Sequence, residues 1–168
     1  KWKEVKGADR YTVYYKVDGD KGWTRITHIK DGCTFLHKNA PDGKKLIYTV
    51  VARNGSFCSS YDKKGISLDY MKTPAVTDIC SVINGIKVTW EKTEAAKSYI
   101  IYRRGAKEKW TYLTSVSSKK SSYTDTTVIP GKTYAYTVRA ENGQINSAYT
   151  SGKPYRYIPE NSITSIGT

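Results

Sequence analysis

Side chains able to do acid–base chemistry are few in this chain of 168 residues and stand far apart. The two histidines are His28 and His37, and we expect both at the surface rather than around a metal ion. Acidic residues of the second half, such as Glu91, Glu108 and Asp125, fall on expected loops and strand ends without forming a pair. No serine nucleophile elbow, phosphate loop or calcium loop is present. The sequence therefore predicts a protein that is not an enzyme, with no catalytic residue, no metal site and no cofactor.

The three cysteines, Cys33, Cys58 and Cys80, are the other reactive side chains. No Cys-x-x-Cys pair occurs, and the histidines have no zinc-type spacing relative to them. An odd number leaves at least one thiol without an intramolecular partner. We interpret all three as small, half-buried residues rather than as a disulfide framework.

Aromatic and basic side chains offer binding chemistry instead. The chain has 15 Tyr, 4 Trp and 28 Lys plus Arg, with a net charge of +13. Residues 1–73 carry 15 basic and 8 acidic side chains, residues 74–158 carry 13 and 6, and no Lys or Arg run exceeds two. Nucleic-acid binders concentrate their basic residues on one face or arm. We therefore predict no nucleic-acid partner, and the absence of any run of about 18 apolar residues predicts a chain that does not span a membrane.

The composition indicates which elements must position these side chains. Only four residues are Leu, whereas Ile, Val, Thr and Tyr are abundant. β-branched and aromatic side chains favour strands, and helical proteins rely more on Leu and Ala. The sequence therefore predicts an all-β protein.

An internal repeat divides the chain. Residues 43–61 align with residues 131–149, with ten identities in nineteen positions. Trp2 and Trp23 align with Trp90 and Trp110. A repeat of this period indicates two copies of one domain.

Each copy has the pattern of a β-sandwich, with short strands between turn signals. Asn-Gly pairs mark tight turns, since both residues tolerate positive φ. Bulges at Lys64-Gly65 and Ser151-Gly152 are expected to interrupt the last strand of each copy. In the second copy the predicted strands are residues 76–81, 85–90, 98–104, 110–116, 121–124, 132–141 and 144–157.

The second copy resembles a fibronectin type III domain. The resemblance lies in Trp90, in Tyr99-x-Ile101 and in the motif Pro130-Gly131-x-x-Tyr134-x-Tyr136-x-Val138-x-Ala140-x-Asn142. It implies two tandem immunoglobulin-like (fibronectin type III) β-sandwiches. It also implies that the Tyr134 hydroxyl bonds back to the chain upstream, as in a tyrosine corner. The first copy departs from this pattern, with Leu46 in that position.

A finer resemblance concerns the source. A Trp opening the fourth strand and the motif Tyr-Thr-Val-x-Ala-x-Asn-Gly in the sixth are similar to repeats in surface proteins of gut-dwelling Gram-positive bacteria. This implies a bacterial protein that is secreted or displayed at the cell surface.

The repeat predicts three parts. Residues 1–72 form a domain that lacks its first strand, and residues 73–158 form a complete domain. Residues 159–168 form a tail, in which Ile163–Ile166 match Val76–Ile79 and predict the first strand of a following repeat. Strand exchange of this tail with a neighbouring copy is a further expectation, and a frayed tail is its alternative.

Alternation along the strands predicts which side chains face outward. It places Leu46 and Tyr48 inward in the first copy and Tyr134 and Tyr136 inward in the second. The outward set, predicted as a candidate binding face, is Tyr14, Trp23, Ile47, Val51 and Arg53 in the first copy, and Tyr102, Trp110 and Arg139 in the second. The alternative is that Trp23 and Trp110 cover Lys stems and their own sheet.

Three functions remain open on this basis. The first is an adhesin module that binds a host macromolecule through the aromatic face, because Tyr, Trp and Arg dominate interface hot spots. A host glycoprotein is the expected partner, and the bacterial resemblance adds immunoglobulin as a candidate. The second is a spacer or weak glycan-binding module of a secreted polysaccharide-degrading enzyme. The third is a purely structural stalk.

Overall fold

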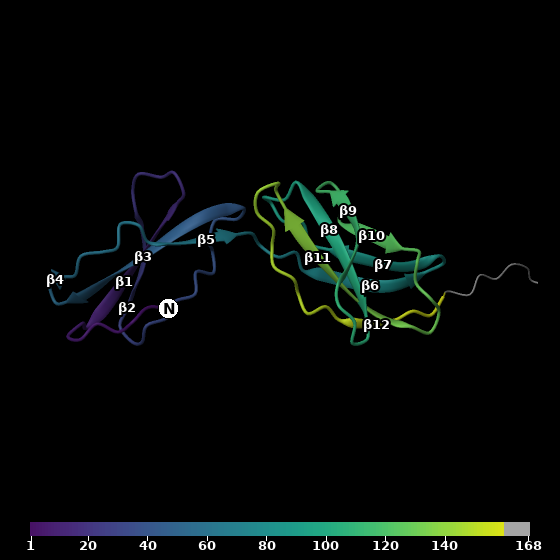
Figure 1. Ribbon diagram of the computed structural model, residues 1–168, viewed down its shortest axis with the longest axis horizontal. Helices are drawn as coiled ribbons and strands as arrows, with labels where there is room; N and C mark the ends of the chain where they lie inside the picture. Colours follow the sequence, from purple (N-terminus) through teal and green to yellow (C-terminus); the bar gives the residue numbers. More distant parts are fainter. Residues whose placement is uncertain (160–168) are drawn as a thin grey trace, which may run out of the picture. The chain divides into compact units, whose positions relative to one another are not determined.

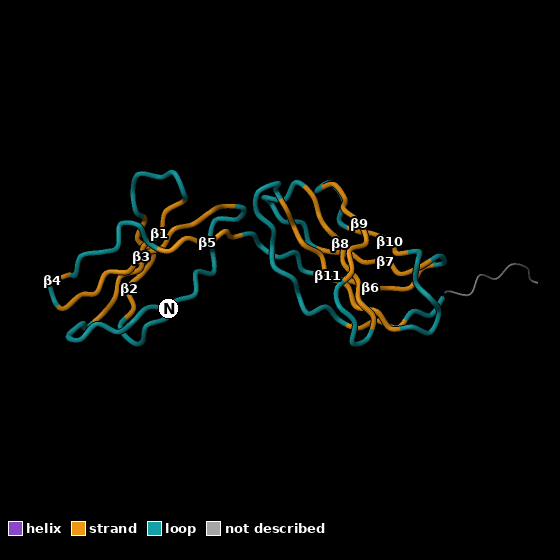
Figure 2. Tube along the Cα trace, viewed as in Figure 1, coloured by secondary structure: helices purple, strands orange, loops and turns teal. Residues whose placement is uncertain are grey.

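The computed structural model describes residues 1–159, and every regular element in that range is a β-strand (Figures 1 and 2). The all-β prediction is confirmed. The chain divides into two compact units, Lys1–Tyr70 and Met71–Thr168, called unit 1 and unit 2 below. The predicted strand at 163–166 lies outside the described residues. No helix within residues 1–159 has the length and apolar character needed to cross a membrane.

Unit 2 has two antiparallel sheets, with strand orders β10-β7-β6 and β12-β11-β8-β9 (Figure 1). Strand boundaries predicted from the repeat agree with those observed to within one residue, except that only three residues of the predicted last strand, 144–157, form β12. The strands are β6 (Val76–Val82), β7 (Gly85–Trp90), β8 (Ser98–Gly105), β9 (Thr111–Ser117), β10 (Ser122–Asp125), β11 (Thr133–Glu141) and β12 (Pro154–Arg156).

The core of unit 2 lies between its two sheets. Val88, Ile101 and Tyr136 are fully buried, in keeping with the alternation of their strands. Trp90 packs on Tyr99 with ring centroids 5.5 Å apart. The Ile129 N–H donates to the Tyr134 hydroxyl over 3.1 Å, which confirms the expected tyrosine-corner bond.

Unit 1 has one sheet, in the order β2-β1-β3-β4, with β5 also paired to β3. Trp2 aligns with Trp90 at the end of β7, but residues 1–5 form no strand. The Trp2 N–H donates to the Cys33 carbonyl over 3.0 Å, as the Trp90 N–H does to Ser121 over 2.9 Å. In unit 2 that strand is paired on both sides, by β6 and β10, whereas the described part of unit 1 has no β6 equivalent. The strands are β1 (Arg10–Val17), β2 (Thr24–Ile29), β3 (Lys44–Asn54), β4 (Phe57–Cys58) and β5 (Ile66–Tyr70).

The inner face of unit 1 is therefore thinly covered. Leu46 is fully buried, but its β5 partner Leu68 is 53% exposed, and Ile66 is 74% exposed. In unit 2 the position of Leu68 is held by Tyr155, whose hydroxyl accepts a bond of 2.8 Å from the Ser81 N–H. Unit 1 consequently has the smaller core, although it keeps the same strand order.

Candidate binding face

The last strand of each unit is interrupted by an irregular segment, as predicted from its glycine. These crossing segments are residues 59–65 in unit 1 and 147–153 in unit 2. Gly65 has φ of 62° and Gly152 has φ of 68°. A Cβ on Gly65 would lie 2.6 Å from the Tyr48 carbonyl oxygen, and one on Gly152 would lie 2.8 Å from the Tyr136 carbonyl oxygen. Both positions therefore require glycine, because side chains have neither the space nor the backbone freedom there.

The crossing segments cover the face of each sheet that is turned away from the core, called the outer face below. Side chains that alternation places outward are buried as a result: Val51 is 6% exposed and Thr137 is fully buried. The Thr137 hydroxyl lies 3.0 Å from the Thr150 hydroxyl of the crossing segment. Alternation thus gives the correct direction of these side chains but not their burial.

In unit 2 the outer face is filled by an arginine. The Arg139 guanidinium lies over the Tyr149 ring, 4.4 Å from its centroid. Its Nε donates to the Ser147 carbonyl over 2.7 Å, and its Nη1 donates to the Tyr149 hydroxyl over 3.2 Å. The Tyr102 ring meets Tyr149 edge-on at 5.1 Å. The hydrogen bond with Tyr102 and the charge of Arg139 together lower the pKa of the Tyr149 hydroxyl.

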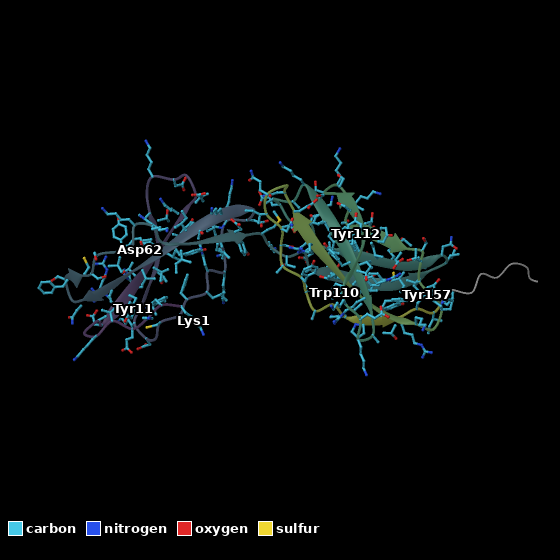
Figure 3. The ribbon with its side chains drawn as sticks, viewed as in Figure 1. Lys1, Tyr11, Asp62, Trp110, Tyr112 and Tyr157 are labelled. Atoms are coloured by element: carbon cyan, nitrogen blue, oxygen red, sulfur yellow. The ribbon has the colours of Figure 1, made fainter. Side chains whose placement is uncertain are left out.

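Trp110 lies just before β9 and is also engaged within unit 2 (Figure 3). The Arg104 guanidinium lies 4.7 Å from the centroid of the Trp110 ring. Arg104 Nη2 also donates to the Ser151 carbonyl over 3.1 Å. The Lys16 ammonium lies over the Trp23 ring in unit 1 in the same way, so the alternative in which each tryptophan carries a basic side chain fits both units.

In unit 1 the same place is hollow. Val51 stands where unit 2 has Arg139, and Tyr61 packs edge-on against Trp23 at 6.1 Å. The hollow measures about 350 Å³. Its lining residues are Tyr14, Trp23, Thr49, Val51, Arg53, Cys58, Ser59 and Tyr61.

The charge around this hollow is positive. Arg53 Nε donates to the Thr12 hydroxyl over 2.8 Å, and Nη2 lies 3.4 Å from the Tyr14 hydroxyl. The ammonium of Lys16 lies 5.2 Å from the centroid of the Trp23 ring. No acidic residue is among the lining residues of the hollow. Asp62, labelled in Figure 3, lies on the crossing segment, where its carboxylate accepts a bond of 2.9 Å from the Lys64 N–H.

The structure brings together most of the predicted face of unit 1. Tyr14, Trp23, Val51 and Arg53 line the hollow, whereas Ile47 lies under the crossing segment beside Gly65. In unit 2, Tyr102 and Arg139 meet at Tyr149, and Trp110 lies with Arg104 instead.

Sequence reasoning missed four lining residues: Thr49, Cys58, Ser59 and Tyr61. Tyr61 has a detectable signal, because it is identical to Tyr149 in the repeat. The interpretation of Cys58 as half-buried is wrong, since it is exposed, whereas Cys33 and Cys80 are half-buried as expected. Cys58 is exposed because it lies on the two-residue edge strand β4, which pairs only with β3.

A buried polar group lies inside unit 2. Asp125 is fully buried and accepts hydrogen bonds from the Tyr136 hydroxyl (2.9 Å), Arg103 Nη1 (2.8 Å) and the Thr127 hydroxyl (2.7 Å). Burial alone would raise the pKa of Asp125, but the hydrogen bonds from Thr127, Tyr136 and Arg103 outweigh burial and lower it. The Asp125 carboxylate is thus hydrogen-bonded within unit 2 and has no solvent exposure.

The equivalent place in unit 1 holds a histidine. His37 Nδ1 lies 3.0 Å from the Tyr48 hydroxyl, and its ring meets Tyr15 edge-on at 5.0 Å. His37, expected at the surface, is half-buried among aromatic rings, and this burial lowers its pKa. His28 is exposed and lies 2.9 Å from the Thr12 hydroxyl. Within residues 1–159, no three His, Cys, Asp or Glu side chains are grouped so that they could hold a metal ion.

Comparison with solved structures finds tandem fibronectin type III segments. The chain is 18% identical to the FN1–FN3 domains of chicken CNTN1, with a TM-score of 0.46 over 90% of this chain and 55% of that one. It is also 18% identical to a two-domain fibronectin type III segment from chicken tenascin, with a TM-score of 0.45 over 92% of this chain and 87% of that one. No family model and no curated protein matches the sequence. At such values the architecture rests on the strand order and register of the chain itself.

Proposed function

We propose that the chain is a non-catalytic binding module of a bacterial surface or secreted protein, and that unit 1 contacts a host macromolecule through its outer face. One observation carries this proposal. The two units share their strand order around β1, β3, β8 and β11, yet the outer face is filled in unit 2 and hollow in unit 1. A hollow lined by Tyr, Trp and Arg side chains has the composition of an interface hot spot.

The partner class follows from the surface and from the resemblance of the repeats. A net charge of +13 attracts acidic macromolecules and accelerates encounter with them. Host glycoproteins are the partners proposed here, with immunoglobulin as the first one to test. The extracellular location rests on the resemblance to tandem modules of surface proteins.

The test compares the two faces within the full chain. The double substitution Tyr14→Ala with Trp23→Ala removes two walls of the hollow, and Tyr102→Ala with Trp110→Ala is the matched change in unit 2. Each variant is applied to immobilised serum glycoproteins, including immunoglobulin, and to an immobilised glycan panel. We expect binding to a glycoprotein that weakens by at least about tenfold in the unit 1 variant and by less than about twofold in the unit 2 variant.

Equal loss in both variants, or no loss in either, would contradict the proposal. Thermal unfolding of each variant shows whether a loss reflects misfolding. Binding confined to the glycan panel would favour an accessory module of a polysaccharide-degrading enzyme.

Unit 2 favours a second role, as a spacer. Its outer face is closed by Arg139 and Tyr149, and its core is the larger of the two. If the full chain binds neither panel, a purely structural stalk describes both units.

A further inference from the structure

The hollow of unit 1 has features that define the chemistry of its occupant, provided that the proposed binding function holds. Its walls are the rings of Tyr14, Trp23 and Tyr61, and Val51 and Thr49 lie on the sheet beneath them. A volume of about 350 Å³ is at the lower end of small-ligand sites. The hollow therefore suits one bulky side chain rather than an extended ligand.

Two polar groups of the lining, the Ser59 hydroxyl and Arg53 Nε, are already engaged, which leaves fewer partners for the hydroxyls of a sugar. The Ser59 hydroxyl accepts from the Ala52 N–H over 3.1 Å and donates to the Ser60 carbonyl over 2.8 Å. Arg53 Nε is held by the Thr12 hydroxyl. A saccharide needs partners for its several hydroxyls, because unpaired polar groups are costly to bury. An apolar or aromatic side chain has no such need.

Unit 2 raises the opposite possibility, that the hollow accepts an arginine from a partner. Arg139 occupies the equivalent space there and stacks on Tyr149. In unit 1, however, Arg53 lines the hollow, the Lys16 ammonium lies over the Trp23 ring that forms one of its walls, and no acidic residue is among the lining residues. A third cation would be repelled, whereas a carboxylate beside the apolar group would be attracted.

We infer that the hollow of unit 1 receives an apolar or aromatic side chain of a protein partner, with an adjacent carboxylate of that partner held by Arg53. The guanidinium is suited to this role, because its Nη2 has only a long contact of 3.4 Å with the Tyr14 hydroxyl. Guanidinium and carboxylate form charge-assisted hydrogen bonds, which are stronger than neutral ones. The recognition element is thus an acidic peptide segment with one large apolar residue.

Three blocked peptides test this inference on the full chain: acetyl-Glu-Trp-Glu-amide, acetyl-Gln-Trp-Gln-amide and acetyl-Glu-Ala-Glu-amide. The readout is the NMR shift of the Trp23 indole N–H during titration to about 5 mM peptide, since a single small site gives affinities in the millimolar range. We expect the first peptide to shift this signal, and the neutral and the alanine peptides to bind on the order of tenfold more weakly.

Two variants locate the site. Val51→Arg introduces the side chain that fills this space in unit 2, and Arg53→Gln removes the charge. Both substitutions should weaken the binding of the first peptide on the order of tenfold. Arg139→Val in unit 2 is the matched control and should leave the shift of Trp23 unchanged. Arg53→Gln preserves the test if Val51→Arg does not fold.

Several results would overturn the inference. These are equal binding of the charged and neutral peptides, undiminished binding in Arg53→Gln, or no shift with any peptide. The proposed function fails separately. Peptide binding at Trp23 without binding to any macromolecule on the panels would leave the hollow as assigned and refute the binding role. A macromolecule that binds through unit 1 but is not displaced by the first peptide would support the binding role and refute the assignment of the hollow.

Discussion

Units 1 and 2 use the same backbone arrangement around two different polar groups. Unit 2 has an ion pair between the fully buried carboxylate of Asp125 and the half-buried Arg103, and the Tyr136 hydroxyl bonds to the same carboxylate. Unit 1 replaces it with His37 bonded to Tyr48, packed against Tyr15 in place of Arg103. Tyr48 on β3 and Tyr136 on β11 are equivalent, so the hydroxyl is common to both units and only its hydrogen-bond partner differs.

The outer faces differ in the same manner. Arg139 closes the face of unit 2 from within, whereas Val51 leaves a hollow in unit 1. Tyr61 and Tyr149 occupy equivalent positions, but one meets a tryptophan and the other a tyrosine. One residue position therefore decides whether the covering segment seals the sheet or frames an opening.

The largest expected effect concerns the inner polar groups. Asp125→Ala removes the carboxylate that bonds the buried Tyr136 hydroxyl and the half-buried Arg103 guanidinium, and should lower the free energy of unfolding of unit 2 by about 2–4 kcal/mol. His37→Ala leaves only the half-buried Tyr48 hydroxyl and should lower that of unit 1 by about 1 kcal/mol.

Urea unfolding followed by NMR signals from β1 and β8 measures the two units separately. A larger loss of unfolding free energy from His37→Ala than from Asp125→Ala would show that the ion pair does not stabilise its unit more than the histidine stabilises unit 1.

A smaller and equal effect is expected at the crossing segments. Gly65→Ala and Gly152→Ala each place a methyl group against a backbone carbonyl at positive φ, and each should cost its own unit about 2 kcal/mol. Gly131 has positive φ but open space around it, so Gly131→Ala is the control for the cost of φ alone. Amide hydrogen exchange of β3 and β11 reports the loss. Unequal costs at the two glycines would mean that the crossing segments are not equivalent.

The smallest effect distinguishes the units by pH. The folded pKa of His37 lies below its ordinary value of 6.5, so the unfolded chain binds the proton more readily. This contribution to the stability of unit 1 is present above pH 6.5 and is lost as the pH falls through the folded pKa.

Asp125 has a folded pKa below 3.8, so its contribution to unit 2 is present above pH 3.8 and is lost only as the pH falls below that. Thermal unfolding between pH 7.5 and 3 should therefore show unit 1 weakening first, as the pH falls below 6.5, and unit 2 only as it falls below 3.8. In His37→Gln this step should vanish. If it persisted there, another group of unit 1 would be responsible.

Much of unit 2 is predictable from sequence because its inner strands β7, β8 and β11 each pair with a neighbouring strand on both sides. Alternation in 98–104 reflects the burial of Tyr99 and Ile101, and the Tyr134 bond is the one that the resemblance to a fibronectin type III domain implies. Unit 1 is less predictable. Residues 1–5 have the side chains of a strand but lack its neighbour on one side, and strand formation depends on pairing as much as on composition.

The hollow could be predicted only in part. Alternation assigns Val51, Trp23 and Tyr14 to one face, and the glycines predict an interruption of the last strand. The sequence pattern does not predict that the interrupting residues fold back over that face. This depends on the close approach of Gly65 to the Trp23 ring. The direction of Tyr61 is likewise a tertiary effect.

The position shared by Val51 and Arg139 has a consequence for how such a protein can change. It lies on the outer face beneath the crossing segment, so exchanging a large cation for a small apolar residue there would open or close the proposed site away from the packing between the sheets. In a chain of repeated units, the number of open sites can then be altered by single codon changes while the length and spacing of the chain stay constant. Avidity depends on how many weak sites act together, so under the proposed function selection at this one position would tune binding strength separately from folding.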